Sequence, residues 1–149
     1  MSRAPCVWPD WITGLRADGS PYRPSGRWGA YVSRIGDYMT RAIIETPWGS
    51  LRLHHIRRPD RGRHHHDHPF DFVSVLLTGG YVEERNPWDV VRAARLPGSV
   101  AFRRAEDLHT ISAVLPGTWT FVVAGPRRRE WGFATPRRWI GWRDYREEA

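Results

Sequence analysis

The sequence predicts an all-β protein made of one domain, an antiparallel sandwich or barrel. Its 149 residues and 17.3 kDa fit a single domain with one real core. The 14 glycines and 12 prolines interrupt the chain so often that no long helical period survives between them. A hydrophobic content of 40% with 13% aromatic residues indicates a packed globule rather than a disordered chain.

From residue 40 onward, short apolar segments alternate with tight turns. The turn TPWG separates TRAIIE from SLRLHHIR, and the turn TGG separates FDFVSVLLT from GYVEER. The turn NPWD leads into DVVRAAR. The turn LPG leads into SVAFR, and the turn LPGT separates HTISAV from TWTFVVA. The last apolar segment is EWGFA. Each turn carries the Gly, Pro, Asn or Asp that turns require, and this strand spacing is typical of a sandwich or barrel. The nine strands are expected at residues 40–45, 50–57, 70–78, 80–85, 89–95, 99–103, 109–114, 118–124 and 130–134.

The two ends of the chain lack this pattern. Residues 1–39 are expected to form an irregular N-terminal arm that packs on the barrel, with room for one helix around residues 28–39. The barrel itself is expected to span residues 40–136. Residues 137–149 form a C-terminal tail whose tryptophans pack over the barrel. No repeat or second domain is evident.

The charge of the chain limits its partners. The formal net charge is +7, and all 23 basic residues are arginine. They occur as scattered pairs without a basic helix, so nucleic acid is a disfavoured partner. A small anionic substrate would benefit from the same positive field. A homodimer is also compatible with the sequence.

Membrane and secretion signals are missing from the sequence. No apolar run approaches the roughly 18 residues of a membrane span, so no membrane partner is expected. The N-terminus lacks the apolar region of a signal peptide. Cys6 is the single cysteine, which excludes an internal disulfide and fits a reducing cytoplasm.

The stretch HHHDHPFDF, residues 64–72, places four histidines in five positions. Alternate side chains of an extended segment share a face, so either His64 with His66 or His66 with His68 could chelate one ion. A metal needs at least a third ligand from elsewhere in the fold. The alternative interpretation is a polar loop whose histidines are only solvated.

The segment resembles the first motif of the cupin superfamily, in which a glycine precedes H-x-H, a short gap, a glutamate, six residues and a closing glycine. That glycine falls eleven or twelve positions after the second histidine. Counting from His68 reaches Gly79 or Gly80, whereas counting from His66 reaches no glycine. The resemblance therefore implies that His66 and His68 form the chelating pair.

The second cupin motif is a glycine, five residues, P-x-G, two residues and a histidine. Counted from Gly98, it ends on His109. Arg104 and Glu106 replace its proline and second glycine, and the glutamate slot of the first motif falls on Phe72 or Val73, neither of which binds metal. The resemblance thus implies an RmlC-like jelly roll with a three-histidine site, similar in ligand set to the thiol dioxygenases. Its implied metal ligands are His66, His68 and His109.

Three imidazoles leave coordination positions open for a substrate and O₂ together. Fe(II) is the favoured ion, although Mn, Ni, Cu and Zn accept the same ligands. The leading hypothesis is therefore a mononuclear metal-dependent enzyme that oxidises a small, anionic organic molecule in a dioxygenase-type reaction. The alternatives are a metal-dependent isomerase, epimerase or lyase, and a non-catalytic ligand-binding or nucleic-acid-associated protein.

Other residues receive roles within this hypothesis. Tyr81 and Glu83 are candidate catalytic groups, acting as acid or base. The arginines expected to orient the substrate anion are Arg104, Arg127 and Arg129. A fourth metal ligand is left open among Asp71, Glu83 and Glu84. Asp67 should face away from its histidine neighbours and help to close the loop, while His64 and His65 have no assigned role.

Overall fold

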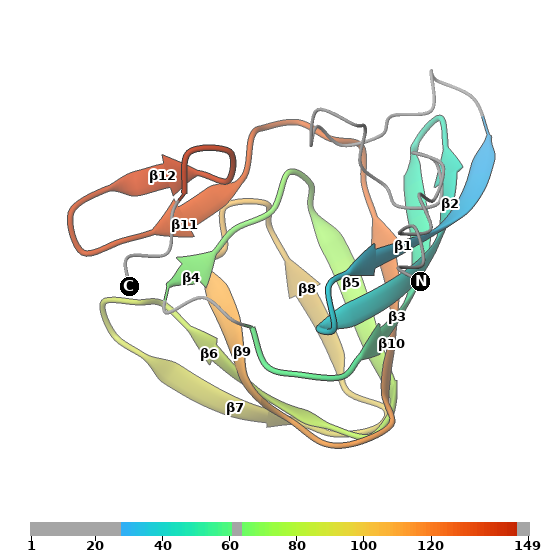
Figure 1. Cartoon of the computed structure of the whole chain (residues 1–149), viewed down its shortest axis with the longest axis horizontal. Helices are drawn as coiled ribbons and strands as arrows, with labels where there is room; N and C mark the ends of the chain where they lie inside the picture. The colour runs from blue at the N-terminus through green and yellow to red at the C-terminus, as the bar shows by residue number, and fades with distance from the viewer. Residues whose placement is uncertain (1–27, 61–63, 146–149) are drawn as a thin grey trace, which may run out of the picture.

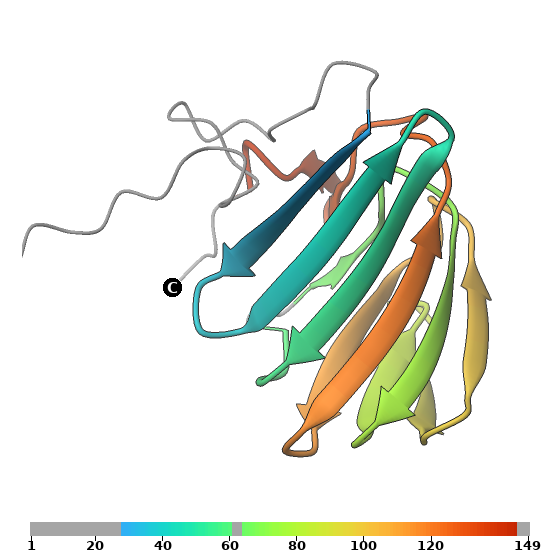
Figure 2. The ribbon, with the colours of Figure 1, turned by 90° about the vertical axis from the view of Figure 1, so that its right-hand side faces the viewer.

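A computed structural model describes residues 28–60 and 64–145 of the chain. Over these residues it contains two six-stranded antiparallel sheets and no helix (Figure 1). The first sheet, seen face on in Figure 2, has the order β1 (Gly29–Ile35), β2 (Met39–Thr46), β3 (Gly49–Ile56), β10 (Thr118–Ala124), β5 (Phe72–Thr78) and β8 (Val100–Arg103). The second has the order β12 (Trp139–Gly141), β11 (Gly132–Ala134), β4 (His65–His66), β9 (His109–Val114), β6 (Tyr81–Arg85) and β7 (Val91–Arg95).

The predicted all-β class is confirmed, and all nine predicted strands are present, as β2, β3 and β5 to β11. The helix considered around residues 28–39 is wrong, because Gly29–Ile35 forms β1 and pairs along its whole length with β2. The segment alternates with a period of two, Ser33 being buried and Val32 exposed. Gly36, with a φ of 51°, provides the turn that closes this hairpin.

The sheets thus begin within the segment expected to be the arm, and β12 lies within the expected tail. Residues 1–27 of that arm lie outside the described residues. No helix able to cross a bilayer occurs in the part of the chain that the structure describes.

The two sheets pack face to face through a small apolar cluster. Met39 and Ile56 come from the first sheet and Ile111 from the second, and all three are buried. The strand β10 shows the alternation that defines the inner face, with Thr118, Thr120, Val122 and Ala124 buried and the residues between them exposed. Serines, threonines and Arg103 share the buried positions outside this cluster with apolar residues such as Ile43 and Leu76, so the interior is of mixed polarity.

The glycine turn between β5 and β6 carries the chain from the first sheet to the second. Gly79 has a φ of 75°, and a side chain on it would overlap Thr118. The Thr118 hydroxyl accepts a hydrogen bond from the Gly80 amide at 3.0 Å. The closing glycine of the first motif is therefore required both by the backbone conformation and by this close approach.

Candidate metal centre

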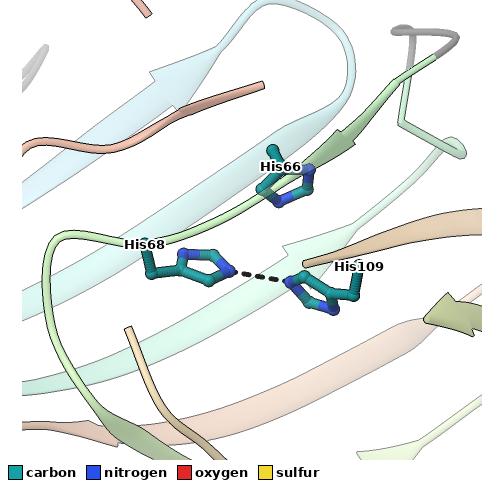
Figure 3. A group of neighbouring side chains, drawn as sticks. All are labelled: His66, His68 and His109. Carbon is teal, nitrogen blue, oxygen red and sulfur yellow. Dashed lines mark hydrogen bonds between the residues drawn. The ribbon is translucent and has the colours of Figure 1, made fainter. Parts of the chain in front are cut away.

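Three histidines from two strands and a loop converge at one point between the sheets (Figure 3). His66 ends β4, His68 follows two residues later, and His109 begins β9, where its Cα pairs with that of His66. The ring centroids lie 4.9 to 5.1 Å apart. One nitrogen from each ring lies within 4.8 Å of the other two, and the Nε2 atoms of His68 and His109 are 2.7 Å apart. These three side chains, called the histidine triad below, could hold one metal ion.

Asp67 sets the conformation that aims its two neighbours inward. Its carboxylate is buried and accepts hydrogen bonds from the Gly132 amide at 2.7 Å and the Trp139 indole at 2.9 Å. Arg129 forms an ion pair with the same carboxylate at 2.5 Å. Because Asp67 points to this side of the extended segment, His66 and His68 point to the other. The expectation that Asp67 faces away from the triad and closes the loop is confirmed.

Glu83 of β6 holds the third histidine. The Nδ1 atom of His109 donates to Glu83 Oε1 at 2.9 Å, and Arg103 and Arg95 bind the same carboxylate. Burial raises the pKa of Glu83, but the hydrogen bonds from His109 and Arg103 outweigh it and hold the pKa far below its usual range. The ionised carboxylate keeps the proton on Nδ1, so the Nε2 lone pair of His109 is directed toward the other triad rings.

The other two triad rings are neutral at physiological pH. Burial lowers the pKa of His66 to about 4. Burial, followed by the charges of His109 and His66, lowers the pKa of His68 well below its ordinary value. A metal requires deprotonated imidazole nitrogens, so this environment suits ligation. The residues of the triad therefore fit a bound ion in donor type, convergence and protonation.

Asp60 lies beside His66 and was not found by the sequence analysis. Its Oδ2 atom lies 3.8 Å from His66 Nδ1 and accepts a hydrogen bond from the Ile111 amide at 2.7 Å. Carboxylates commonly orient metal-binding imidazoles through the nitrogen that faces away from the ion. The available signal was an acidic residue shortly before the histidine run, but its spacing implies no contact.

His64 and His65 stay outside the triad. The Nδ1 atom of His64 lies 3.0 Å from the Tyr145 hydroxyl. His65 precedes His66 in β4, so its ring lies on the opposite side of the strand. There its Nε2 atom is buried, and no described residue forms a hydrogen bond with it.

The candidates for a fourth ligand have other partners. Asp71 accepts the Ala105 amide at 2.7 Å and Arg128 at 2.6 Å. Glu84 accepts Arg92 at 2.8 Å. The metal-ligating group found among residues 28–60 and 64–145 contains the three histidines and no carboxylate.

The predicted substrate groups have the following surroundings in the structure. Tyr81 packs against the apolar cluster, and burial raises the pKa of its phenol. Arg104 is exposed. Arg127 pairs with Glu130 at 2.9 Å, and Arg129 is held by Asp67. The roles of these residues toward a substrate stay predictions.

Aromatic rings line the triad. Phe72 and Phe70 lie beside His68, with ring centroids 4.8 and 6.2 Å away. Phe133 and Trp131 lie beside His66, at 6.2 and 6.4 Å. These walls restrict water around the histidine nitrogens, which strengthens electrostatic interactions there.

Solved structures of cupins share this architecture. KdgF from Halomonas sp. aligns with a TM-score of 0.54 and 19% identity, over 65% of this chain and 86% of KdgF. An RmlC-like cupin from Shewanella frigidimarina aligns with a TM-score of 0.51 and 18% identity, over 66% of this chain and 86% of that protein. Hydroxypropylphosphonic acid epoxidase from S. wedmorenis aligns with a TM-score of 0.52 and 13% identity, over 79% of this chain and 64% of the epoxidase.

No protein-family model matches the chain. No curated protein matches it significantly either. The structural similarities establish the fold: this chain is a cupin-type jelly roll, as the two sequence motifs implied, and it carries a histidine triad that could bind a metal.

Proposed function

We propose that this chain is a mononuclear metal-dependent enzyme that oxidises a small anionic organic molecule with O₂. The single observation that carries the proposal is the convergence of the triad, with His109 oriented by an ionised Glu83. When bound, an Fe(II) ion would supply a redox-active centre with coordination positions left open for small molecules.

The residues of the chain support this chemistry in separate ways. His66, His68 and His109 would hold the ion through neutral nitrogens. Glu83 would hold the orientation of the His109 ring through its hydrogen bond, and the Asp60 carboxylate, 3.8 Å from His66 Nδ1, would place a negative charge beside a second ring. Three neutral ligands would leave the full charge of the ion in the site, which favours an anionic substrate.

One structural neighbour supports the choice of iron. The epoxidase HppE has been solved in its Fe(II) form, and its alignment with this chain has a TM-score of 0.51 and 15% identity. Its name describes action on a phosphonic acid, a small anion. At this identity the likeness concerns the fold, so iron and O₂ chemistry belong to the proposal.

Metal analysis tests the centre. Purified protein reconstituted with Fe(II) under anaerobic conditions should hold about one equivalent of iron, and the His109→Ala variant should hold almost none. His64→Ala is the matched control, because this histidine belongs to the same run but lies outside the triad. Equal iron content in all three proteins would contradict the proposal.

O₂ consumption tests the reaction class. The iron-loaded protein should consume O₂ in the presence of some members of a panel of small carboxylic and phosphonic acids. Turnover of a panel member without O₂ would instead support the isomerase or lyase alternative, in which Tyr81 or Glu83 would act as acid or base. Ligand binding that survives complete chelation of the metal, without any turnover, would support the non-catalytic alternative.

A further inference from the structure

The inner face of the first sheet carries a second polar cluster, opposite the triad. Arg41 lies on β2, and Arg52 and His54 lie on β3. Arg41 pairs in register with His54, and Arg52 pairs with Ile43 on the next inward rung. All three residues lie two positions from a buried residue of the same strand, and so on the strand face that carries Met39, Ile43, Ser50 and Ile56. Their side chains therefore point between the sheets.

Two buried nitrogens of this cluster have no hydrogen-bond partner among residues 28–60 and 64–145. Arg41 donates through Nη2 to the Ser33 hydroxyl at 3.0 Å, but its Nε atom is buried without a hydrogen bond. The Nε2 atom of His54 is also buried and unpartnered. Buried polar groups in proteins are almost always hydrogen-bonded, so two neighbouring exceptions on one inward face indicate a place for a ligand.

The cluster also has an excess of positive charge. Arg52 donates to the neutral Ser50 hydroxyl at 2.8 Å. Glu45 is the carboxylate that acts on both guanidinium groups, and it also accepts the Tyr31 hydroxyl at 2.9 Å. His54 is neutral, because burial and then the charges of Arg41 and Arg52 lower its pKa well below the ordinary value. Within the part of the chain that the structure describes, two cations of the cluster therefore face one carboxylate.

The ring of Phe70 lies next to both the cluster and the triad. The Arg52 guanidinium sits over the ring of Phe70 at 4.3 Å from its centroid, and Phe70 stacks beside His68. A small molecule held by this cluster would therefore have its other end near the histidine nitrogens.

We propose that Arg41, Arg52 and His54 form a subsite that binds the carboxylate group of the substrate used at the triad. The inference rests on the proposed function for its catalytic meaning, but the subsite itself does not require metal. One carboxylate would neutralise the single excess positive charge, whereas a phosphate or phosphonate dianion would leave the cluster with a net negative charge. The unpartnered Nε–H of Arg41, and His54 in the tautomer that carries its proton on Nε2, would each donate to one of the two oxygens of a carboxylate. This subsite takes the place of the anion site that the sequence analysis assigned to Arg104, Arg127 and Arg129.

Ligand-observed NMR with simple probes tests the subsite in metal-free wild-type protein. Acetate should bind, methylphosphonate should bind more weakly at a pH where it is a dianion, and the uncharged acetamide should not bind. In Arg41→Met and Arg52→Met the acetate dissociation constant should rise at least tenfold. Arg57→Met is the matched control, because Arg57 is exposed and donates to Thr40 outside the cluster.

Acetate binding that is unchanged in both variants, or equally strong binding of acetamide, would overturn the proposal. The His109→Ala protein should still bind acetate, so a failed metal site and a failed subsite give different results. The two methionine variants should stay folded, because they remove buried charges that the fold does not fully pair. If either unfolds, His54→Gln keeps both cations and should weaken acetate binding severalfold; no change there would also refute the subsite.

Discussion

Glu83 Oε1 lies 2.9 Å from the Nδ1 atom of His109, with Arg103 bound to the other side of the same carboxylate. This arrangement fixes both the ring orientation and the protonated nitrogen of one triad member before any ion arrives. It also explains why a buried glutamate on β6 can remain ionised, since its negative charge is matched by Arg103 and Arg95.

Replacing Glu83 by glutamine should weaken metal binding by roughly 10- to 100-fold, because the neutral amide no longer fixes the His109 tautomer. Competition with a chromophoric chelator at a temperature well below unfolding measures the effect. Glu84→Gln is the control, since Glu84 pairs with the exposed Arg92 on the neighbouring strand. Identical metal affinities in wild type and Glu83→Gln would refute the role of this contact.

Replacing Asp67 by alanine should lower the free energy of unfolding by about 1–3 kcal/mol, because the buried Gly132 amide loses its acceptor and the half-buried Arg129 loses its charge partner. The same change should loosen the segment that aims His66 and His68, so metal affinity should fall as well. Chemical denaturation and metal titration measure the two effects. The exposed Asp89→Ala should change neither, and a stable Asp67→Ala protein with full metal affinity would contradict the assignment.

The metal-free protein should lose stability as the pH falls below about 6.5, in part through His54. Its pKa is lowered in the folded chain by burial and by Arg41 and Arg52, while the unfolded chain keeps the ordinary value of 6.5. The folded state then binds fewer protons than the unfolded state, so the stabilisation is complete above pH 6.5 and is lost as the pH falls below it.

His54 contributes at most about 1.4 kcal/mol per pH unit to the slope of the free energy of unfolding against pH. The charged groups facing His54 are Arg41 on β2 and Arg52 on β3; the pairing residue on β10 is the uncharged Thr120. Denaturation of wild type and His54→Gln between pH 7 and pH 5 should show a shallower loss in the variant. His55→Gln, on the outer face against Trp119, should keep the wild-type slope, and parallel curves for all three proteins would rule out the assignment.

The outer face of the first sheet should mediate self-association. One rung across five strands carries only exposed apolar side chains, which pair in register from strand to strand. They are Ile44, Leu51, Val123, Val73 and Phe102. The rung has no charge that would select a different partner, and a two-fold dimer places such a face against its own copy.

Sedimentation analysis should therefore find a dimer for the wild type and a monomer for Phe121→Glu, which adds a charge next to this rung. Arg34→Glu, at the edge of the same sheet, is the control for the change of charge and should remain dimeric. A wild-type monomer at high protein concentration would show that this face has another role.

The sequence by itself determined nine of the twelve strands in the described residues and pointed to the three histidines that the structure brings together. Turn residues such as Gly79 and Gly80 punctuate the chain locally, and the two motif counts lead to His68 and His109, which the structure brings together. The missed strand β1 marks the limit of this reasoning, because its short alternation could be recognised only through its pairing with β2.

Only the tertiary structure decided which side chains support the triad and which face it. Glu83 meets His109 because β6 pairs with β9, and Arg41 meets His54 because β2 pairs with β3. Both contacts depend on the register between strands and on the packing of one sheet against the other. A local pattern of residue types contains neither quantity, so the carboxylates behind the histidines and the cations opposite them had to be read from the folded chain.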